Sequence, residues 1–385
     1  MRRICLFGVA LLLFFSSCEQ KKTVTGEVKG LTNDTLLVMR VDLDKYGKDL
    51  QDRFSDTIVA VDGKFAFDPA ATGAVKLFII PKEAVVSREG GGYIPGAKVA
   101  EFVLLPGEKV KLEGTLNATW FDYKLSGAPL AEELSRISSP WRYEQHTADS
   151  IEMLLHEGRV PFDSVAAQRR EVYDKIREGK LDYIRTHLDN LAAGYYLAGM
   201  PMDTTIKYYA LLSEDVKNSA LKPMLDYYNE QIERYHMAQE AKNQVTEGTV
   251  APDFTLKTDK GEDFTLSSLK GKYAVLDFWG SWCGYCIKGI PDMKKYYDKY
   301  KGKVEFVSIA CRDNDEKWRE ALGKYEMPWI QVRNNDTDAA TDLSIVYGIE
   351  GYPTKYILDG NGVIVSKIIG ERPEFYKKLD ELLEK

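Results

Sequence analysis

The stretch "AVLDFWGSWCGYC" (274–286) joins an apolar run to two cysteines that are separated by two residues. The apolar run is typical of a buried strand, and a helix is expected to start near Cys283. Unpaired N–H groups and the helix dipole favour a thiolate at such a position, so Cys283 is the predicted nucleophile. Cys286 follows one turn later on the same face, within reach of the sulfur that Cys283 attacks. It is therefore the predicted resolving thiol.

Three other uses of a cysteine pair fit the sequence less well. A tetrahedral zinc site needs four ligands, and residues 246–385 offer only Cys311 besides the pair and no histidine. A structural disulfide across two residues closes too small a loop to restrict the unfolded chain much. A cysteine hydrolase would need a histidine base from elsewhere in the chain. The pair is thus predicted to be redox active, and Cys311 to be a buried apolar side chain at the end of a strand.

Strands and helices alternate from 246 to 385. The predicted strands are 273–279, 304–310, 329–332, 354–359 and 363–369, and the predicted helices start near Cys283 and cover 315–325, 340–348 and 374–385. Such alternation predicts an α/β layer with helices on both faces of a sheet.

Several separated motifs in this region resemble the thioredoxin superfamily. They are "AVLDFWGSWCGYC", Pro291 and "GYPT" (351–354). The segments "APDFTL" (251–256) and "LSSLKGK" (266–272), with the βα insertion at 304–332, resemble its exported branch, the TlpA/ResA-like thiol-disulfide oxidoreductases. The resemblance covers about 247–385. It implies a multidomain protein whose C-terminal domain, 246–385, has an α/β thioredoxin-like fold and uses a redox-active Cys283–Cys286 disulfide without another cofactor or a metal.

The resemblance also implies roles for residues outside the pair. Pro353 would carry a cis peptide bond facing the cysteines, which leaves the Tyr352 backbone able to pair with a substrate strand. Asp277 would be a buried acid that exchanges the proton of the resolving cysteine, and burial raises its pKa toward that use. Trp279 could line the rim of the disulfide or pack in the core. The predicted substrate-binding side chains are Trp282, Tyr285 and Tyr352.

Residues 18–127 are expected to form an N-terminal antiparallel β module, resembling a sandwich. "TIVAVDGKFAF" (57–67) alternates apolar and polar residues on both sides of Asp62–Gly63, which is a strong hairpin signal. "FVLLPGEKVKLEG" (102–114) repeats the pattern around Pro106–Gly107. Each segment predicts two strands joined as a hairpin.

Residues 128–245 change to a helical period. Five apolar residues recur at spacings of three and four, as one buried helical stripe requires. They are Leu221, Leu225, Tyr228, Ile232 and Tyr235. The segment also holds the four histidines of the chain, His146, His156, His187 and His236, without ligand spacing, so no metal site is predicted there.

The N-terminus resembles an export signal. Arg2 and Arg3 precede the apolar run 4–15, which is too short to span a bilayer and is typical of a signal peptide over 1–17. "FSSC" (15–18) resembles a lipoprotein cleavage site, which implies that Cys18 becomes the acylated first residue. We therefore expect a periplasmic or outer-membrane lipoprotein of a Gram-negative cell envelope, held to the membrane by its lipid anchor.

The net charge of the chain and the two residues between the cysteines indicate which binding partners and substrates to expect. The formal net charge of −7 disfavours nucleic acid. Gly284 and Tyr285 bring no positive charge to the thiolate, whereas strong oxidants of this fold often carry histidine there. Together with Asp277, this favours a reductase of disulfide-containing exported proteins. The chain has no flavin or nicotinamide motif, and the resemblance implies a thiol electron donor in the membrane.

Two rival functions stay open. "APDFTL" also occurs in peroxiredoxins, although those enzymes usually place threonine or serine where this chain has Gly280, three residues before Cys283. In the second rival, the β module captures a surface ligand through Trp120 and Tyr123, and the thioredoxin-like region is a passive scaffold.

Overall fold

The computed structural model describes residues 22–47, 54–88, 91–334 and 337–384. The expected signal peptide, 1–17, and Cys18 lie outside these residues. The chain divides into two compact units, Met1–Asn229 and Glu230–Lys385. Among the helices of the described residues, none combines the length and the hydropathy that a membrane span requires.

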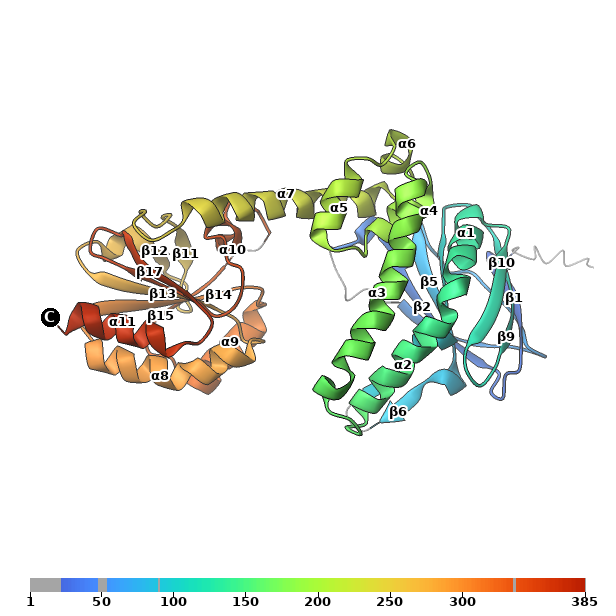
Figure 1. The fold of residues 1–385 in the computed structure, drawn as a ribbon, viewed down its shortest axis with the longest axis horizontal. Helices are drawn as coiled ribbons and strands as arrows, with labels where there is room; N and C mark the ends of the chain where they lie inside the picture. Colours follow the sequence, from blue (N-terminus) through green and yellow to red (C-terminus); the bar gives the residue numbers. More distant parts are fainter. Residues whose placement is uncertain (1–21, 48–53, 89–90, 335–336, 385) are drawn as a thin grey trace, which may run out of the picture. The chain divides into compact units, whose positions relative to one another are not determined.

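Two four-stranded sheets form the framework of the N-terminal unit (Figure 1). One sheet has the order β10-β9-β1-β4, with β1 Val24–Lys29, β4 Lys64–Phe67, β9 Val110–Leu116 and β10 Phe121–Ser126. The other has the order β3-β2-β5-β8, with β2 Thr35–Asp42, β3 Phe54–Val59, β5 Val75–Pro81 and β8 Ala100–Leu104. A short separate pair consists of β6 Val86–Arg88 and β7 Gly91–Tyr93. Alternate side chains of the two large sheets, such as Val24, Leu77 and Phe102, share one apolar core.

The strand pairing differs from the expected antiparallel module in two ways. First, β1 and β9 run parallel. Second, β3 and β4 belong to different sheets, as do β8 and β9, although Val61 and Lys64 form an isolated antiparallel bridge across the first predicted hairpin turn. Asp62 and Gly63 have φ values of 51° and 75°, as a tight turn requires. The turn residues therefore match the expectation and the pairing does not, since alternation marks a half-buried strand without naming its partner.

Helices follow the strands in the N-terminal unit. They are α1 Pro129–Ser138, α2 Arg142–His156, α3 Phe162–Thr186, α4 Leu191–Leu197, α5 Met202–Tyr209, α6 Glu214–Lys217 and the first part of α7 Lys222–Gln244. Helix α1 packs on β8 and β10. Of the predicted stripe, Leu221, Leu225 and Ile232 are buried, whereas Tyr235 is 38% exposed. Tyr235 belongs to the C-terminal unit, in which the neighbouring Arg234 forms an ion pair with Asp342.

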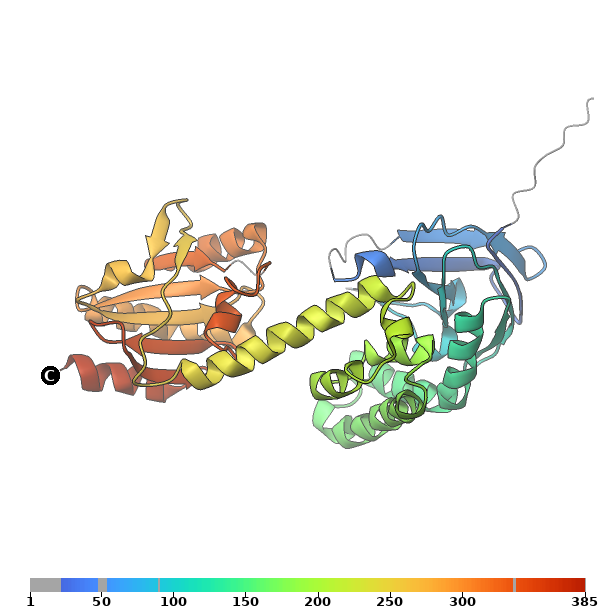
Figure 2. The ribbon, with the colours of Figure 1, turned by 90° about the horizontal axis from the view of Figure 1, so that it is seen from above.

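The C-terminal unit is built on one five-stranded sheet with the order β15-β14-β13-β16-β17 (Figure 2). Its elements are β11 Thr255–Lys257, β12 Asp263–Thr265, β13 Tyr273–Trp279, α8 Gly284–Tyr300, β14 Val304–Ala310, α9 Asp315–Tyr325, β15 Ile330–Arg333, α10 Leu343–Val346, β16 Thr354–Leu358, β17 Ile364–Ile369 and α11 Pro373–Leu383. Strands β13, β14 and β15 run parallel, and β16 and β17 are antiparallel to their neighbours. Helices α8, α9 and α11 cover one face, and α10 with the β11–β12 pair covers the other. The thioredoxin-like fold expected for this region is present. The segment predicted as a βα insertion, 304–332, holds β14, α9 and most of β15.

Candidate active site

The cysteine pair lies where β13 ends and α8 begins. Cys283 and Cys286 form a disulfide, and Cys283 is the N-cap residue of α8. The Cys286 backbone N–H donates to Cys283 Sγ over 3.1 Å. A reduced Cys283 would therefore face the unpaired N–H groups of the first turn, which stabilise a thiolate. Both cysteines are 6% exposed, so substrate reaches the sulfurs through a small opening.

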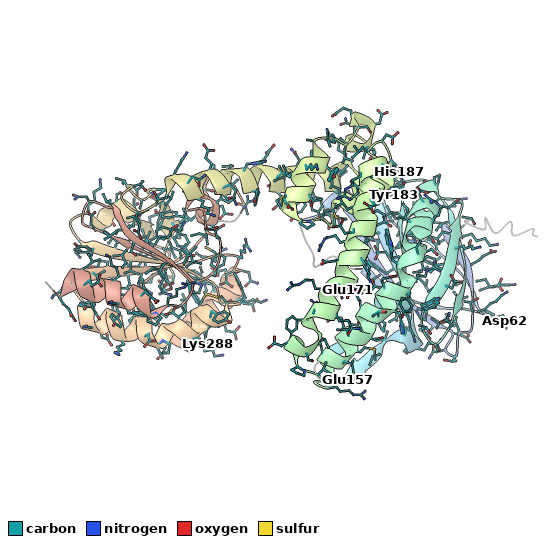
Figure 3. All side chains as sticks on the ribbon, in the orientation of Figure 1. Asp62, Glu157, Glu171, Tyr183, His187 and Lys288 are labelled. Atoms are coloured by element: carbon teal, nitrogen blue, oxygen red, sulfur yellow. A yellow bond between two sulfur atoms is a disulfide. The ribbon has the colours of Figure 1, made fainter. Side chains whose placement is uncertain are left out.

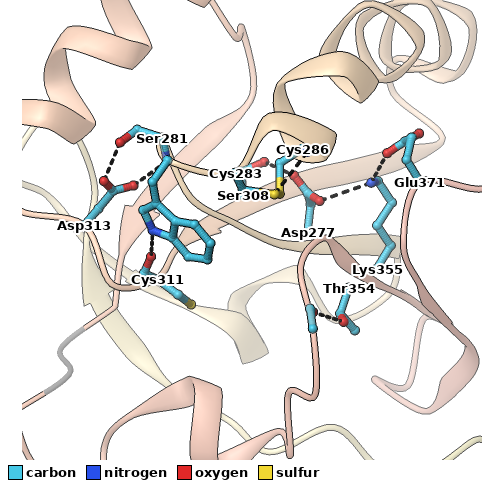
Figure 4. Close-up of a disulfide and its surroundings, with 12 residues drawn as sticks. Asp277, Ser281, Cys283, Cys286, Ser308, Cys311, Asp313, Thr354, Lys355 and Glu371 are labelled. Atoms are coloured by element: carbon cyan, nitrogen blue, oxygen red, sulfur yellow. Dashed lines mark hydrogen bonds and ion pairs between the residues drawn. A yellow bond between two sulfur atoms is a disulfide. The ribbon is translucent and has the colours of Figure 1, made fainter. Parts of the chain in front are cut away.

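A row of polar side chains lies on the sheet face that α8 covers (Figure 4). Asp277 on β13 is in register with Ser308 on β14 and with Lys355 on β16. The Ser308 hydroxyl donates to Asp277 Oδ2 over 2.9 Å, and Lys355 Nζ lies 3.5 Å from Asp277 Oδ1. The Trp329 indole N–H donates to the Ser308 hydroxyl over 2.9 Å. Three neighbouring strands thus hold the Asp277 carboxylate beneath the helix that carries Cys286.

Glu371, after the last strand, completes this row. Lys355 Nζ lies 2.6 Å from Glu371 Oε2, and the Tyr376 hydroxyl donates to Glu371 Oε1 over 2.7 Å. Gly289 in α8 leaves room for the carboxylate, since a Cβ at that position would lie 2.2 Å from Glu371 Oε2. Lys355 therefore sits between two carboxylates that come from different elements.

Burial and the Lys355 charge act in opposite directions on the pKa of Asp277. Loss of water contact raises the pKa of its carboxyl group, and the Glu371 charge adds to that rise. Lys355 and the Ser308 hydroxyl act to lower the pKa, but burial dominates and the pKa stays above the ordinary value of 3.8. A carboxyl group with a raised pKa is a better proton acceptor than an ordinary carboxylate, which suits it to exchange a proton with a thiol.

Aromatic side chains surround the disulfide on the outside. Trp282 is 51% exposed and Tyr285 71% exposed, which is unusual for large aromatic residues. The Trp282 ring lies edge-on to Tyr352, with 5.3 Å between the centroids. Lys288, labelled in Figure 3, places its ammonium group 5.6 Å from the centroid of the Tyr285 ring. The Tyr352–Pro353 peptide bond, at the edge of this surface, is cis.

Hydrogen bonds fix the loop that precedes the cysteines. The Trp282 indole N–H donates to the Cys311 carbonyl over 3.1 Å. The Ser281 backbone N–H donates to Asp313 Oδ2 over 2.7 Å, and the Ser281 hydroxyl donates to Asp313 Oδ1 over 2.5 Å. The Trp282 ring is therefore oriented by a hydrogen bond to the Cys311 backbone as well as by its contact with the Tyr352 ring.

Trp279 and Cys311 are both core residues. Trp279 is 1% exposed, which excludes it from the rim and leaves core packing as its role. Cys311 is completely buried and takes part in no disulfide. Within the described residues, no group of three or more histidine, cysteine or acidic side chains is arranged to hold a metal ion.

Sequence reasoning missed Lys355 and Glu371. Lys355 stands in the apolar strand 354–358, in which every residue is buried. A charged residue inside such a strand is a signal in itself, because lysine is almost never fully buried without a partner. The partner could not be read from the sequence, because Glu371 follows a different strand.

Known proteins match the part of the chain that contains the cysteine pair. Residues 248–367 match the AhpC/TSA family. The thiol-disulfide oxidoreductase ResA of Bacillus cereus is 31% identical over 145 residues, which is 37% of this chain and 80% of ResA. The thioredoxin-like protein YneN of Bacillus subtilis is 33% identical over 142 residues, which is 35% of this chain and 80% of YneN.

A solved structure also matches this region. The thioredoxin domain of a thiol-disulfide oxidoreductase from Bacteroides vulgatus is 29% identical and covers 36% of this chain and 97% of its own, with a TM-score of 0.33. ResA and YneN are matched over most of their length, and the matched part of this chain contains the cysteine pair and its polar row. The chain therefore belongs to the ResA-type thiol-disulfide oxidoreductases, a family with a thioredoxin-like domain.

Proposed function

We propose that the protein is an exported reductase of protein disulfides that works through the Cys283–Cys286 dithiol. The observation that carries the proposal is the position of the pair, with Cys283 as the N-cap of α8 and the buried Asp277 beneath the same helix. The start of the helix favours a thiolate on Cys283, and the carboxylate offers a proton acceptor for Cys286.

The reaction runs in two exchanges. The Cys283 thiolate attacks one sulfur of the substrate disulfide, forms a mixed disulfide and releases the other substrate sulfur as a thiolate. Cys286 then loses its proton to Asp277 and attacks the Cys283 sulfur, which releases the second substrate thiolate. The substrate gains two electrons, and the protein is left with the Cys283–Cys286 disulfide. A thiol donor in the membrane would reduce that disulfide and return the protein to its starting state.

Lys355 and Glu371 would act as positioning residues in the second exchange. Lys355 lies near both carboxylates, at 3.5 Å from Asp277 and 2.6 Å from Glu371, so its charge is shared between them. Because Glu371 draws Lys355 toward itself, the Asp277 carboxylate is stabilised less and holds a proton more readily. The pair would thereby keep Asp277 suited to proton exchange.

Substrate would bind beside the cysteines on the exposed aromatic surface. Trp282, Tyr285 and Tyr352 supply apolar contacts around the two sulfurs. The Tyr352 backbone, before the cis Pro353, would pair with an extended substrate segment, as the family resemblance implies. Aromatic contacts and backbone hydrogen bonds suit substrate proteins of varied sequence.

Export and membrane attachment are part of the proposal. They rest on Arg2 and Arg3, the apolar run 4–15 and "FSSC" at 15–18. We propose cleavage before Cys18 and acylation of that residue, which would place the protein on a membrane of the cell envelope. The domain bounds proposed with it are 1–17 for the signal peptide, 18–127, 128–245 and 246–385.

Trapping of substrates tests the function. A Cys286→Ala variant cannot resolve the mixed disulfide, so we expect disulfide-linked partner proteins to accumulate on Cys283 in the native envelope. The matched control is the Cys283→Ala, Cys286→Ala double variant, which should capture none. If the single variant captures no more than the double variant, the protein does not exchange disulfides with proteins.

The AhpC/TSA match gives peroxide reduction as a second candidate. In that reaction a cysteine thiolate attacks peroxide without needing a second cysteine for the first turnover. Gly280, three residues before Cys283, offers no hydroxyl to assist. Rapid single-turnover peroxide consumption by Cys286→Ala, in the absence of trapped proteins, would favour this candidate over disulfide reduction.

A further inference from the structure

A cavity of about 150 Å³ lies within the N-terminal unit. Strands β8 and β10 form one wall, and helices α1 to α4 contribute the others. Of these helices, α1 packs directly on both strands. A cavity of roughly this size can hold a molecule as large as benzene. Much of its lining is aromatic, from Phe102, Phe121, Tyr123, Trp141, Tyr195 and Tyr196.

Two hydrogen-bond donors at this cavity have no acceptor among the described residues. One is Lys180 on α3, whose Nζ lies 5.4 Å from the centroid of the Tyr196 ring and forms no ion pair. The other is the indole N–H of Trp141, whose ring centroid lies 6.4 Å from that of Tyr196. Both donors are therefore close to one aromatic ring of the cavity wall.

Lys180 is half-buried, so its ammonium group has lost part of its contact with water. Loss of water contact lowers the pKa of Lys180, and Glu101 acts against this too weakly to restore it. A cation in such surroundings is stabilised by an anion brought next to it. The cavity thus favours an anionic ligand at the Lys180 end.

Gly179 keeps the indole beside Lys180. A Cβ at position 179 would lie 2.6 Å from Trp141 Nε1. Glycine inside a helix is destabilising, so its presence in α3 is explained by this close approach of the ring. The two donors are held together by the packing of α3 against Trp141.

The remaining charges at the cavity are already balanced. Glu101 Oε1 lies 2.7 Å from Lys76 Nζ and accepts a hydrogen bond of 2.8 Å from the Tyr195 hydroxyl. Arg142 forms an ion pair with Asp122 and donates to the Tyr123 carbonyl over 2.9 Å. One positive charge, that of Lys180, is left for a ligand.

We propose that this cavity binds a small aromatic carboxylate. Its carboxylate would accept hydrogen bonds from Lys180 Nζ and Trp141 Nε1, and its ring would pack among the aromatic side chains of the wall. The site uses Tyr123 but not Trp120, which lines no part of the cavity and lies edge-on to His146 instead. The proposal is independent of the redox function, since all the residues involved belong to the N-terminal unit.

Calorimetric titration of the purified full chain with sodium benzoate tests the proposal. Benzamide keeps the ring and removes the charge, and acetate keeps the charge and removes the ring. We expect saturable binding of benzoate. Benzamide should bind more weakly by about ten-fold or more, because it loses a hydrogen bond to a charged group. Acetate should bind more weakly by about ten-fold or more, because it loses the burial of the ring. No saturation by benzoate at millimolar concentration, or equal affinity for benzamide, would overturn the proposal.

Variants locate the site. Lys180→Met should weaken benzoate binding by about ten-fold or more, and Trp141→Phe, which removes only the N–H, by a smaller factor. The control is Lys175→Met on the same helix, because Lys175 is 57% exposed and pairs with Glu171, labelled in Figure 3. It should leave the affinity unchanged. If a folded Lys180→Met variant, checked by circular dichroism, binds as well as the unaltered protein, the assignment is wrong.

Discussion

Each unit of the chain contains a lysine shielded from water, Lys355 fully and Lys180 in part, and the two lysines differ in their partners. In the C-terminal unit, Lys355 is 2% exposed and lies between the carboxylates of Asp277 and Glu371. In the N-terminal unit, Lys180 lines a cavity and forms no ion pair among the described residues. The first lysine belongs to a closed network in which Lys355 lowers and Glu371 raises the pKa of Asp277. In our proposal the second pairs with a ligand, which would mean that the partners of a lysine indicate its use better than burial does.

Inactivation of the cysteine pair should give the largest difference between the activities of the two units. Cys283→Ala removes the nucleophile, so we expect disulfide reduction to fall by about 1000-fold or more. Benzoate binding should stay unchanged, because the cavity lies in the N-terminal unit. Insulin reduction measures the first effect and calorimetry the second. Loss of both together would mean that the units do not act separately.

Removal of the paired lysine should have the next largest effect. Lys355→Met leaves the buried Asp277 and the half-buried Glu371 without a cation between them, and we expect a loss of about 3–5 kcal/mol in the free energy of unfolding. Lys272→Met is the control, because Lys272 forms an exposed pair of 2.7 Å with Glu305 on a neighbouring strand. Its loss should stay below about 1 kcal/mol. Equal losses in urea unfolding would show that the Lys355 network does not behave as a buried one.

Substitution of the buried acid should affect rate and stability in opposite directions. Asp277→Asn removes the proton acceptor, so we expect disulfide reduction to fall by about 100-fold. Burial raises the pKa of Asp277, so its protonated form favours folding at low pH and this contribution is lost as pH rises through the folded-state pKa. At pH 7 the ionised carboxylate therefore lowers stability.

The asparagine variant should accordingly be more stable than the unaltered protein at pH 7. Each unit by which the pKa is raised corresponds to about 1.4 kcal/mol. The gain should disappear as pH approaches 3.8, the ordinary pKa of the group. Lys355 keeps its pair with Glu371 in this variant. Unfolding curves between pH 4 and pH 8 measure the gain, and a stability difference that does not change with pH would contradict the raised pKa.

Removal of the unpaired lysine should have the smallest effect on stability. Lys180→Met breaks no ion pair among the described residues and replaces a half-buried cation by an apolar side chain, so the free energy of unfolding should not fall by more than about 0.5 kcal/mol. The measurement is urea unfolding in buffer without carboxylates. A loss as large as that of Lys355→Met would mean that Lys180 has a partner within the chain, and the contrast between the two lysines would fail.

The strand-and-helix order of the C-terminal unit could be predicted because its signals are local. The apolar strand 273–279, the start of α8 after Cys283 and the helix 315–325 are each set by neighbouring residues. Helix α10 is shorter than expected, Leu343–Val346, because Asp342 caps it. The pairing of β3, β4, β8 and β9 could not be predicted, since a tight turn such as Asp62–Gly63 fits both a hairpin and a crossing.

The active-site residues could be predicted where they lie in one short stretch of the sequence. Asp277, Cys283 and Cys286 stand within ten residues, whereas Lys355 and Glu371 reach Asp277 only through the pairing of β13 with β16 and the turn after β17. The cavity in the N-terminal unit is more distant still, because Trp141, Lys180 and Tyr196 come from separate helical segments. Such contacts depend on tertiary packing and leave no local pattern.

The reduction potential of the Cys283–Cys286 couple tests the central claim most directly. Gly284 and Tyr285 bring no cation to the thiolate, and Asp277 lies beneath the pair, so we expect a reducing couple. Equilibration of the purified protein with glutathione or dithiothreitol buffers gives the value. The account predicts a potential near that of thioredoxin, about −270 mV. A potential near about −120 mV, that of a strong periplasmic oxidant, would contradict it.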